Sequence, residues 1–507
     1  MAKIILTTLN ARYIHASLGL RYLYANLNEL SQSATMLEFS INEDKYDVAN
    51  KILKHNPQII GFGIYIWNAT QTLELIEHIK KEKPNIDIVC GGPEISFYPK
   101  THPLVLASDF VITGEADLSF GQLCEDLLKQ KRPAQKMITS ELPNVSKVKT
   151  PYHLYNEDDI ANRVVYVEAS RGCPFKCEFC LSSLDKKVRN FPLEQFLDDL
   201  DVLFKKGVRH FKFVDRTFNL HIETSSKILH FFLERYEPGL FIHFELIPDR
   251  LPHALREIIA QFPLGALQFE IGIQTFNPAT EIAISRKQDQ GKTIENLSFL
   301  RQETGVYLHT DLIVGLPGED LNSFAEGFDR LIALNPHEIQ VGILKRLPGT
   351  PISRHDETWE MQYNPNPPYN IIENKVLSAN TIKDLQHFAY FWDRISNSGN
   401  FRKTRHLIWE EASPFWKFLA CAQWLHHYFG RSHSVSLENL VKALFDYLTT
   451  VKKLPETLVG EMLLEDYTRI GRKPLKALKC FAKTKRQKAK GSQWNHPMPR
   501  QNRHLVS

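Results

Sequence analysis

The sequence lacks any uninterrupted apolar run long enough to cross a membrane, and it has only seven cysteines among 507 residues. A membrane helix needs about 20 consecutive apolar residues, so we expect no membrane span. The first residues, MAKIILTTL, are too few for a secretory signal and instead predict a first strand. The cysteines are too unevenly spread to suggest an extracellular disulfide framework. Together these absences favour a cytoplasmic protein.

A large excess of charge is absent too, since the formal net charge is only +4. The last 27 residues contain seven Lys or Arg and no acid, so the remainder carries 4 − 7 = −3. This end of the chain, residues 481–507, has no periodicity, and we expect a basic, disordered tail. Nucleic-acid binding by the tail is a less favoured interpretation.

Strand and helix patterns alternate over residues 1–135. Short apolar, β-branched runs lie at 3–9, 34–40, 59–66, 87–92 and 110–116, with helical patterns between them. This alternation predicts an α/β domain with a parallel, doubly wound sheet, whose ligands bind beyond the carboxyl ends of the strands. Residues 136–162 are polar and contain Pro143 and Pro151, which predicts a linker.

The alternation resumes over residues 163–355. Six further strand patterns lie at 164–170, 211–218, 241–247, 267–275, 307–316 and 338–347. Six parallel strands with crossover helices form either a second open sheet or a partial barrel, and the pattern alone does not separate the two. From 360 to 480 the pattern is helical, with aromatic residues at helical spacing, and it predicts a mostly α-helical domain.

Three of the seven cysteines fall within eight positions, in the stretch RGCPFKCEFC directly after the strand pattern at 164–170. Cys173, Cys177 and Cys180 have C-x3-C-x2-C spacing. A structural zinc site takes four ligands, commonly from two cysteine pairs, but the other four cysteines are isolated. An iron–sulfur cluster usually takes four thiolates, so three would leave one iron open to amino and carboxylate groups. A zinc loop completed by a distant histidine is the alternative.

This spacing, with an aromatic residue before the last cysteine, resembles the signature of the radical S-adenosylmethionine (radical SAM) superfamily. The resemblance covers about 163–355 and implies a partial (β/α)6 barrel with a [4Fe-4S] cluster on the three cysteines. It also implies reductive cleavage of SAM to methionine and a 5′-deoxyadenosyl radical, with a flavodoxin- or ferredoxin-type electron donor. The positions that resemble SAM contacts are Phe179, Asp215, Thr217, Glu245, Glu270, Gln274, Asp311 and Gly315. Helix caps and turns are the alternative roles for such residues.

An α/β domain in front of such a barrel resembles the cobalamin-binding domain of the cobalamin-dependent branch. The matching stretches are IGFGIYIWN, CGGPE and TGEAD, and the candidate cobalamin-binding residues are His15, Tyr65, Trp67, Asn68, Gly91, Gly92, Gly114 and Glu115. The D-x-H-x-x-G motif that supplies an axial histidine is absent, because the corresponding loop is NARYIHASLG. We therefore expect cobalamin to bind base-off, without histidine ligation. A tight turn alone also explains the two adjacent glycines.

The two resemblances together imply a cobalamin-dependent radical SAM enzyme, for which methyl transfer to an unactivated centre is the commonest reaction. A radical rearrangement or cyclisation, a tRNA-modifying methylthiotransferase-like reaction and a non-enzymatic cobalamin or redox sensor are alternatives. The N-terminal domain lacks the cysteine triplet of a second cluster, which argues against methylthiolation. The helical domain resembles an uncharacterised domain that follows this pair in bacteria. The sequence does not identify the substrate or any side chain that takes part in catalysis.

Overall fold

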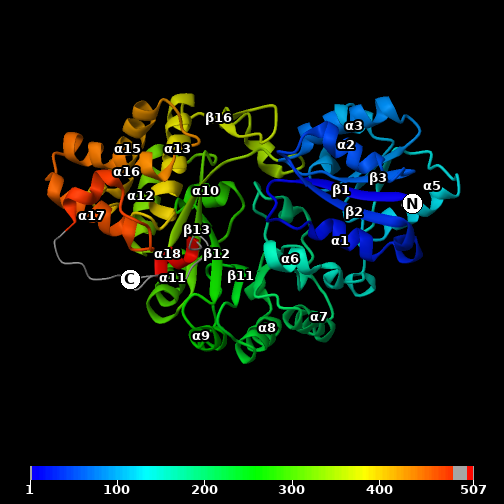
Figure 1. Cartoon of the computed structure of the whole chain (residues 1–507), viewed down its shortest axis with the longest axis horizontal. Coiled ribbons are helices and arrows are strands. Elements are labelled where there is room, and N and C mark those ends of the chain that lie inside the picture. The colour runs from blue at the N-terminus through cyan, green and yellow to red at the C-terminus, as the bar shows by residue number, and fades with distance from the viewer. Residues whose placement is uncertain (1–2, 411, 483–499, 506–507) are drawn as a thin grey trace.

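The structure is a computed structural model that describes residues 3–410, 412–482 and 500–505. Its two α/β domains and its helical domain follow one another along the chain, with the N-terminal domain at one end of the elongated molecule (Figure 1). This confirms the predicted fold class. Within the described ranges, no helix is both long and apolar enough to span a membrane.

The N-terminal sheet is parallel throughout, with the strand order β2-β1-β3-β4-β5-β6. Because the order reverses at β1, successive crossovers place helices on both faces of the sheet. Two separate apolar cores follow, one for each face. The strands are β1 (Ile4–Asn10), β2 (Ala34–Ser40), β3 (Ile59–Gly63), β4 (Asp87–Gly91), β5 (Phe110–Thr113) and β6 (Met137–Thr139), and the helices are α1 (Leu18–Ala25), α2 (Lys45–Leu53), α3 (Ala69–Glu82), α4 (Pro103–Ala107) and α5 (Ser119–Leu128).

The segment predicted as a linker, 136–162, contains regular structure at both ends. Its first residues form β6, the edge strand of the N-terminal sheet, and its last form α6 (Glu157–Asn162). Three residues of strand are too short for a recognisable alternation, which explains why the sequence did not reveal them. Helix α6 begins with a capping box in which Asn156 and Asp159 each satisfy the other's backbone amide.

The second sheet has the order β14-β13-β12-β11-β10-β7, so each strand lies beside the next one in the chain and all pairs are parallel. With right-handed crossovers, such an order places every helix on one face and leaves the other as a lumen. Since β7 and β14 are the two edges, this is a partial barrel, as the family resemblance implied. The strands are β7 (Val165–Val167), β10 (His210–Phe213), β11 (Phe241–Leu246), β12 (Leu267–Gln274), β13 (Tyr307–Val314) and β14 (Glu338–Ile343), and the helices are α7 (Leu193–Lys205), α8 (Ile222–Glu234), α9 (His253–Ala260), α10 (Pro278–Ala283), α11 (Gln290–Glu303) and α12 (Leu321–Ala333).

Both edges of the partial barrel contact a neighbouring domain. At β7, the loop after β1 adds a parallel bridge from His15 to Val164, and Val164 N–H donates to the Ile14 carbonyl at 2.9 Å. At β14, the buried Asn397 side chain donates to the Ile339 carbonyl at 2.8 Å and accepts from its amide at 3.0 Å. These contacts satisfy strand groups that an open edge would leave unpaired.

The C-terminal domain packs against the side of the barrel and shares its apolar core. Aromatic rings of α12 and α15 meet there, because Phe328 lies edge-on to Phe415 with ring centres 5.8 Å apart. After the short hairpin β15 (Gln362–Tyr363) and β16 (Ile371–Glu373), the helices are α13 (Ala379–Trp392), α14 (His406–Trp409), α15 (Pro414–Phe429), α16 (Leu437–Asp446) and α17 (Glu456–Thr468), with π-helical turns at Asp393–Asn397 and Tyr447–Val451.

The predicted disordered tail is wrong for residues 500–505, which form the short helix α18 (Arg500–Leu505). Arg500 donates to Glu338 at 2.7 Å and to Asp393 at 2.6 Å, so the helix is tied to the start of β14 and to the C-terminal domain. Charge pairing with distant acids orders a segment whose composition alone suggests a solvated end. Residues 483–499 and 506–507 of the predicted tail lie outside the described residues.

Candidate active site

A cavity of about 180 Å3 lies at the carboxyl edge of the barrel sheet, and the three clustered cysteines are part of its wall. All of its lining residues fall between 173 and 311, so none comes from the described part of the C-terminal domain. The lining residues are Cys173, Phe175, Cys177, Phe179, Cys180, Ser182, Ser183, Arg216, Thr217, Glu245, Leu246, Ile247, Pro248, Asp249, Glu270, Gly272, Gln274, Arg286, Lys287, Gln288 and Asp311.

The cysteine loop is held in place from within by Glu178. This buried carboxylate accepts hydrogen bonds from Arg354 (2.7 Å to each oxygen), from the Ser285 hydroxyl (2.5 Å) and from His355 (3.0 Å). Burial opposes its ionisation, but these donors keep the pKa of Glu178 below its usual range. All three cysteines of the loop are free thiols. The loop therefore presents three unpaired sulfur ligands on a backbone anchored by its neighbours.

Two arginines beside the loop complete the wall of the cavity. Arg216 donates to both oxygens of Glu245, at 2.8 and 3.1 Å. Arg286 donates to the Cys177 sulfur at 3.5 Å and to the Gln288 side chain at 2.8 Å, and it also donates to the Gly272 carbonyl. Neither arginine was predicted from the sequence, because a basic residue in a polar loop is usually solvated and gives no separate signal.

Six of the eight predicted SAM contacts line this cavity; the exceptions are Asp215 and Gly315. Asp215 is buried and accepts hydrogen bonds from the Ala169 amide (3.0 Å) and the Ser170 hydroxyl (2.6 Å), while burial raises its pKa to about 7. Gly315 has φ +92°, and a Cβ there would lie 2.7 Å from Ile371. In the structure both residues shape the loops that support the cavity.

The floor of the cavity continues into a charged lumen. Burial opposes ionisation of Glu270, but His243, His309 and Lys212 together lower its pKa to about 2. Burial also opposes a charge on His309, yet its hydrogen bond with Asp311 and its ion pair with Glu338 raise its pKa to about 10. Opposite charges thus compensate one another in the lumen.

The N-terminal domain presents a flat aromatic pair after β3. The rings of Tyr65 and Trp67 are stacked, 4.5 Å apart and 5° from parallel, and Trp67 is 42% exposed. Its indole N–H donates to the Leu9 carbonyl at 3.1 Å. By contrast Asn68 is fully buried, and its amide bonds to the backbone of Tyr65, Leu9 and Gly63. Trp67 therefore keeps exposed ring surface that a ligand can contact, whereas Asn68 has a structural role.

The predicted glycines shape the loops at the same edge of the sheet. The Gly91 carbonyl accepts from the Ile64 amide at 2.8 Å. Gly92 has φ +113°, and a Cβ there would lie 2.5 Å from the Ile64 carbonyl oxygen. The Gly114 amide donates to the Ser96 hydroxyl at 3.3 Å. The turn itself thus requires glycine at 92, whatever ligand the loop binds.

Two other predicted cobalamin contacts lie at the junction with the barrel. His15 Nδ1 lies 2.7 Å from the Tyr166 hydroxyl of β7. Glu115 pairs with Arg171 at 2.9 Å and also with Arg189. Burial opposes ionisation of Glu115, but the two arginines lower its pKa. In the structure these side chains join the two domains.

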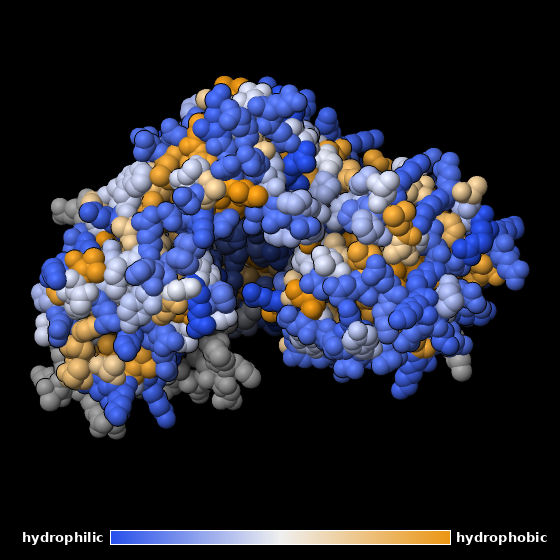
Figure 2. Space-filling model, turned by 90° about the horizontal axis from the view of Figure 1, so that it is seen from above, coloured by the Kyte–Doolittle hydropathy of each residue, from blue (hydrophilic) through white to orange (hydrophobic). Residues whose placement is uncertain are grey.

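Arg171, two residues before Cys173, is the centre of this junction. Its guanidinium also donates to Asp117 at 2.8 and 3.0 Å and to Glu168 at 2.9 Å. On another side of the junction, the Tyr369 hydroxyl donates to Glu94 at 2.8 Å. A space-filling view shows the surface hollowed between the N-terminal domain and the rest of the molecule (Figure 2). The loops at the carboxyl edges of both sheets therefore meet beside the cysteine loop.

Comparison with known proteins matches three family models to consecutive parts of the chain. Residues 4–123 match the B12 binding domain, residues 167–331 match the radical SAM superfamily, and residues 357–505 match a family of unknown function, DUF4080. These matches confirm the two resemblances and the uncharacterised nature of the helical domain.

Three similar proteins match this chain over most of its length. An uncharacterised methyltransferase of Pyrococcus horikoshii, PH0819, is 24% identical over 73% of this chain and 84% of its own length. The cobalamin-dependent radical SAM methyltransferase TokK of Streptomyces tokunonensis is 22% identical over 80% of this chain and 63% of its own. The solved structure of the cobalamin-dependent SAM radical enzyme OxsB superposes with a TM-score of 0.64 at 14% identity, covering 89% of this chain and 79% of that one.

Proposed function

We propose that this protein, in which a B12 binding domain precedes a radical SAM domain, is a cobalamin-dependent methyltransferase acting on an unactivated centre. The observation that carries the proposal is the cavity where three free cysteines converge with charged side chains of both signs, next to the loops of the N-terminal domain. The similarity to methyltransferases such as TokK, which extends over both domains, supports the same assignment.

The residues present fit the implied cofactors. Three thiols on one anchored loop suit a cluster with one open iron. Arg216, Arg286 and the carboxylates of the cavity wall suit a ligand such as SAM, which has amino, carboxylate and sulfonium groups. The exposed ring of Trp67, stacked on Tyr65, suits the flat face of a corrin ring. When bound, the cluster and SAM supply a radical and cobalamin supplies a transferable methyl group.

The chain's own residues orient and insulate this chemistry. We propose that Arg286 donates its hydrogen bond to the Cys177 sulfur, that Phe179 of the cysteine loop packs beside the cluster, and that Thr217, after β10, and Gln274, at the end of β12, contact SAM. The Arg171 ion pairs hold the N-terminal domain at a fixed position beside that loop. Such fixed placement matters, because reacting centres must lie within a few ångströms of each other.

We propose a flavodoxin- or ferredoxin-type protein as the electron donor, and the cytoplasm, where thiols stay reduced, as the compartment. The site does not identify the methyl acceptor. The charged side chains of the lumen, Glu270 and His309, suit a polar molecule.

The test is product analysis after anaerobic reconstitution with iron, sulfide and cobalamin. With SAM carrying a deuterated methyl group, a reductant and an extract that contains the acceptor, we expect S-adenosylhomocysteine and 5′-deoxyadenosine in about equal amounts and a labelled methyl group in a new product. Product and 5′-deoxyadenosine without S-adenosylhomocysteine would instead favour rearrangement or cyclisation. Absence of SAM cleavage by fully reconstituted protein would favour the sensor alternative.

A further inference from the structure

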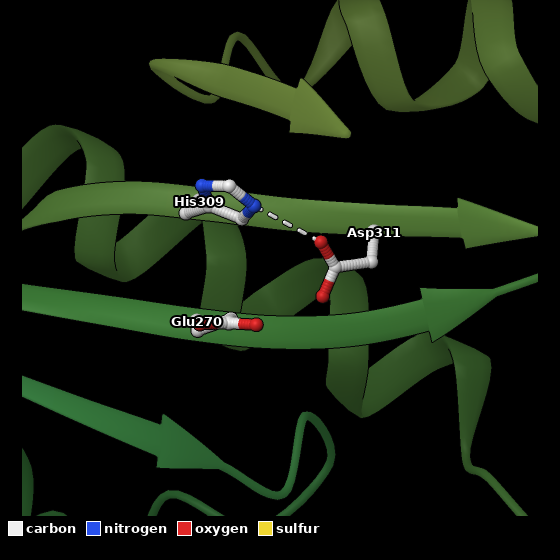
Figure 3. A group of neighbouring side chains, drawn as sticks. All are labelled: Glu270, His309 and Asp311. Carbon is white, nitrogen blue, oxygen red and sulfur yellow. Dashed lines mark hydrogen bonds and ion pairs between the residues drawn. The ribbon is translucent and has the colours of Figure 1, made fainter. Parts of the chain in front are cut away.

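Three side chains that can ligate a metal gather in the lumen of the barrel, and two of them also line the cavity next to the cysteine loop. Glu270 lies on β12, and His309 and Asp311 lie on the neighbouring β13 (Figure 3). Residues 309 and 311 share one face of their strand, and Glu270 is the register partner of His309. One ligand atom from each of the three lies within 4.8 Å of the other two, and His309 Nε2 is 3.0 Å from Asp311 Oδ1.

A fourth side chain, His243, lies beside the same group. His243, on β11, is only 6% exposed, and its Nε2 lies 3.0 Å from Glu270 Oε2. This contact is an ion pair without hydrogen-bond alignment, so among the described residues the buried nitrogen has no hydrogen-bond partner. Buried polar atoms are nearly always paired. A buried ring nitrogen that lies beside Glu270 without a hydrogen-bond partner is placed to serve as a fourth ligand.

The second ring nitrogen of His309, Nδ1, faces a carboxylate, as in known metal sites. His309 Nδ1 lies 3.5 Å from Glu338, which Arg500 fixes through a 2.7 Å bond and to which the Tyr307 hydroxyl also donates. A metal-bound histidine usually directs its other ring nitrogen toward a carboxylate that fixes the tautomer and the ring orientation.

We infer that Glu270, His309 and Asp311, together with His243, form a binding site for a divalent transition metal ion such as Zn2+. Two imidazoles and two carboxylates are ligands that such ions accept. For metal–ligand bonds of about 2.0–2.2 Å, tetrahedral ligands lie about 3.3–3.6 Å apart, so small side-chain rotations bring the group into range. Since Glu270 and Asp311 line the cavity, the metal would lie at the cavity floor. The inference goes beyond the proposed methyl transfer and does not depend on it.

Lys212 is the cation that competes with a metal. Its Nζ lies 3.9 Å from Glu270 Oε2, too far for a hydrogen bond, and its side chain is 31% exposed. The ammonium group can therefore turn toward solvent when a metal binds. Replacing Lys212 should accordingly strengthen metal binding, which is opposite to the effect of removing a ligand.

Binding of Co2+ to the full-length chain with Cys173, Cys177 and Cys180 changed to Ala tests the inference, because the cluster loop then binds no metal. We expect one Co2+ per chain, with visible d–d absorption and no thiolate charge-transfer band, displaced by Zn2+. In that background Asp311→Asn and His309→Gln should each weaken Co2+ binding at least about 100-fold, and Glu338→Gln about 10- to 100-fold. Lys212→Met should bind more tightly.

His210→Gln is the matched control, since His210 lies on the same strand face as Lys212 but outside the group, and it should bind Co2+ unchanged. Thermal unfolding of each variant shows whether it is folded. A folded parent that binds no stoichiometric Co2+, a thiolate band that places the ion on the remaining cysteines, or equal affinity of the parent and the Lys212→Met variant would each overturn the inference.

Discussion

Arg171→Met tests how strongly the buried ion pairs hold the two α/β domains together. The guanidinium is 12% exposed and donates to Glu115, Asp117 and Glu168 over distances of 2.8–3.0 Å. Methionine keeps much of the side-chain volume but leaves carboxylates at the junction without this cation. Removing one partner of a buried ion pair costs about 3–5 kcal/mol, and each kcal/mol lowers Tm by about 2–4 °C in domains of this size. We therefore expect Tm to fall by about 6–20 °C.

Arg132→Met is the matched control. Arg132 also makes a two-pronged pair, with Asp87 at 2.7 and 3.1 Å, but its side chain is 55% exposed. Exposed pairs contribute at most about 1 kcal/mol, so its Tm should fall by no more than about 4 °C. Calorimetry of both variants gives the comparison, and hydrogen exchange should accelerate near Glu115 only for Arg171→Met. Equal, small shifts in Tm would refute the view that the junction depends on Arg171.

Three further outcomes are expected. The variant with Ala at all three clustered cysteines should lose the cluster absorption, the roughly four irons per chain and SAM cleavage, and retention of a full cluster would exclude this ligand set. Electron paramagnetic resonance of bound cob(II)alamin should show no superhyperfine splitting from a protein nitrogen, because His15 is engaged by Tyr166; splitting that disappears in His15→Ala would contradict this. Burial raises the pKa of Glu319 to about 8, so the folded protein holds this proton more tightly than the unfolded chain and loses stability as pH rises from 4.5 to 8. Glu319→Gln should thus raise Tm by an amount that grows over this pH range. A difference in Tm that stays constant with pH would refute the raised pKa of Glu319.

The sequence was most informative where chemistry and spacing are local. Three cysteines within eight residues, placed directly after a strand, predicted the loop that lines the cavity. Six of the eight candidate SAM contacts also line it, because alternate residues near the carboxyl ends of parallel strands share one face. The choice between an open sheet and a partial barrel came from resemblance, since periodicity does not encode strand order.

The sequence was least informative where a residue's partner is far away in the chain. Glu115 and Arg171 are 56 positions apart, so the acid after β5 gave no sign that it joins the domains. Asp215 has the acid-at-strand-end pattern of a ligand contact, but its carboxylate bonds to residues 169 and 170. Helix α18 was missed for the same reason, because the acids that pair with Arg500 belong to two other elements.

The covering of both barrel edges has a consequence for biosynthesis. The N-terminal domain precedes β7 in the chain, so the partner of that edge is already made when the strand appears. Asn397, which covers β14, follows the end of that strand by 397 − 343 = 54 residues. At about 5–20 residues per second, a ribosome needs about 3–11 s to add them. During that interval β14 lacks the partner of its edge, and a chain truncated there would be prone to aggregation.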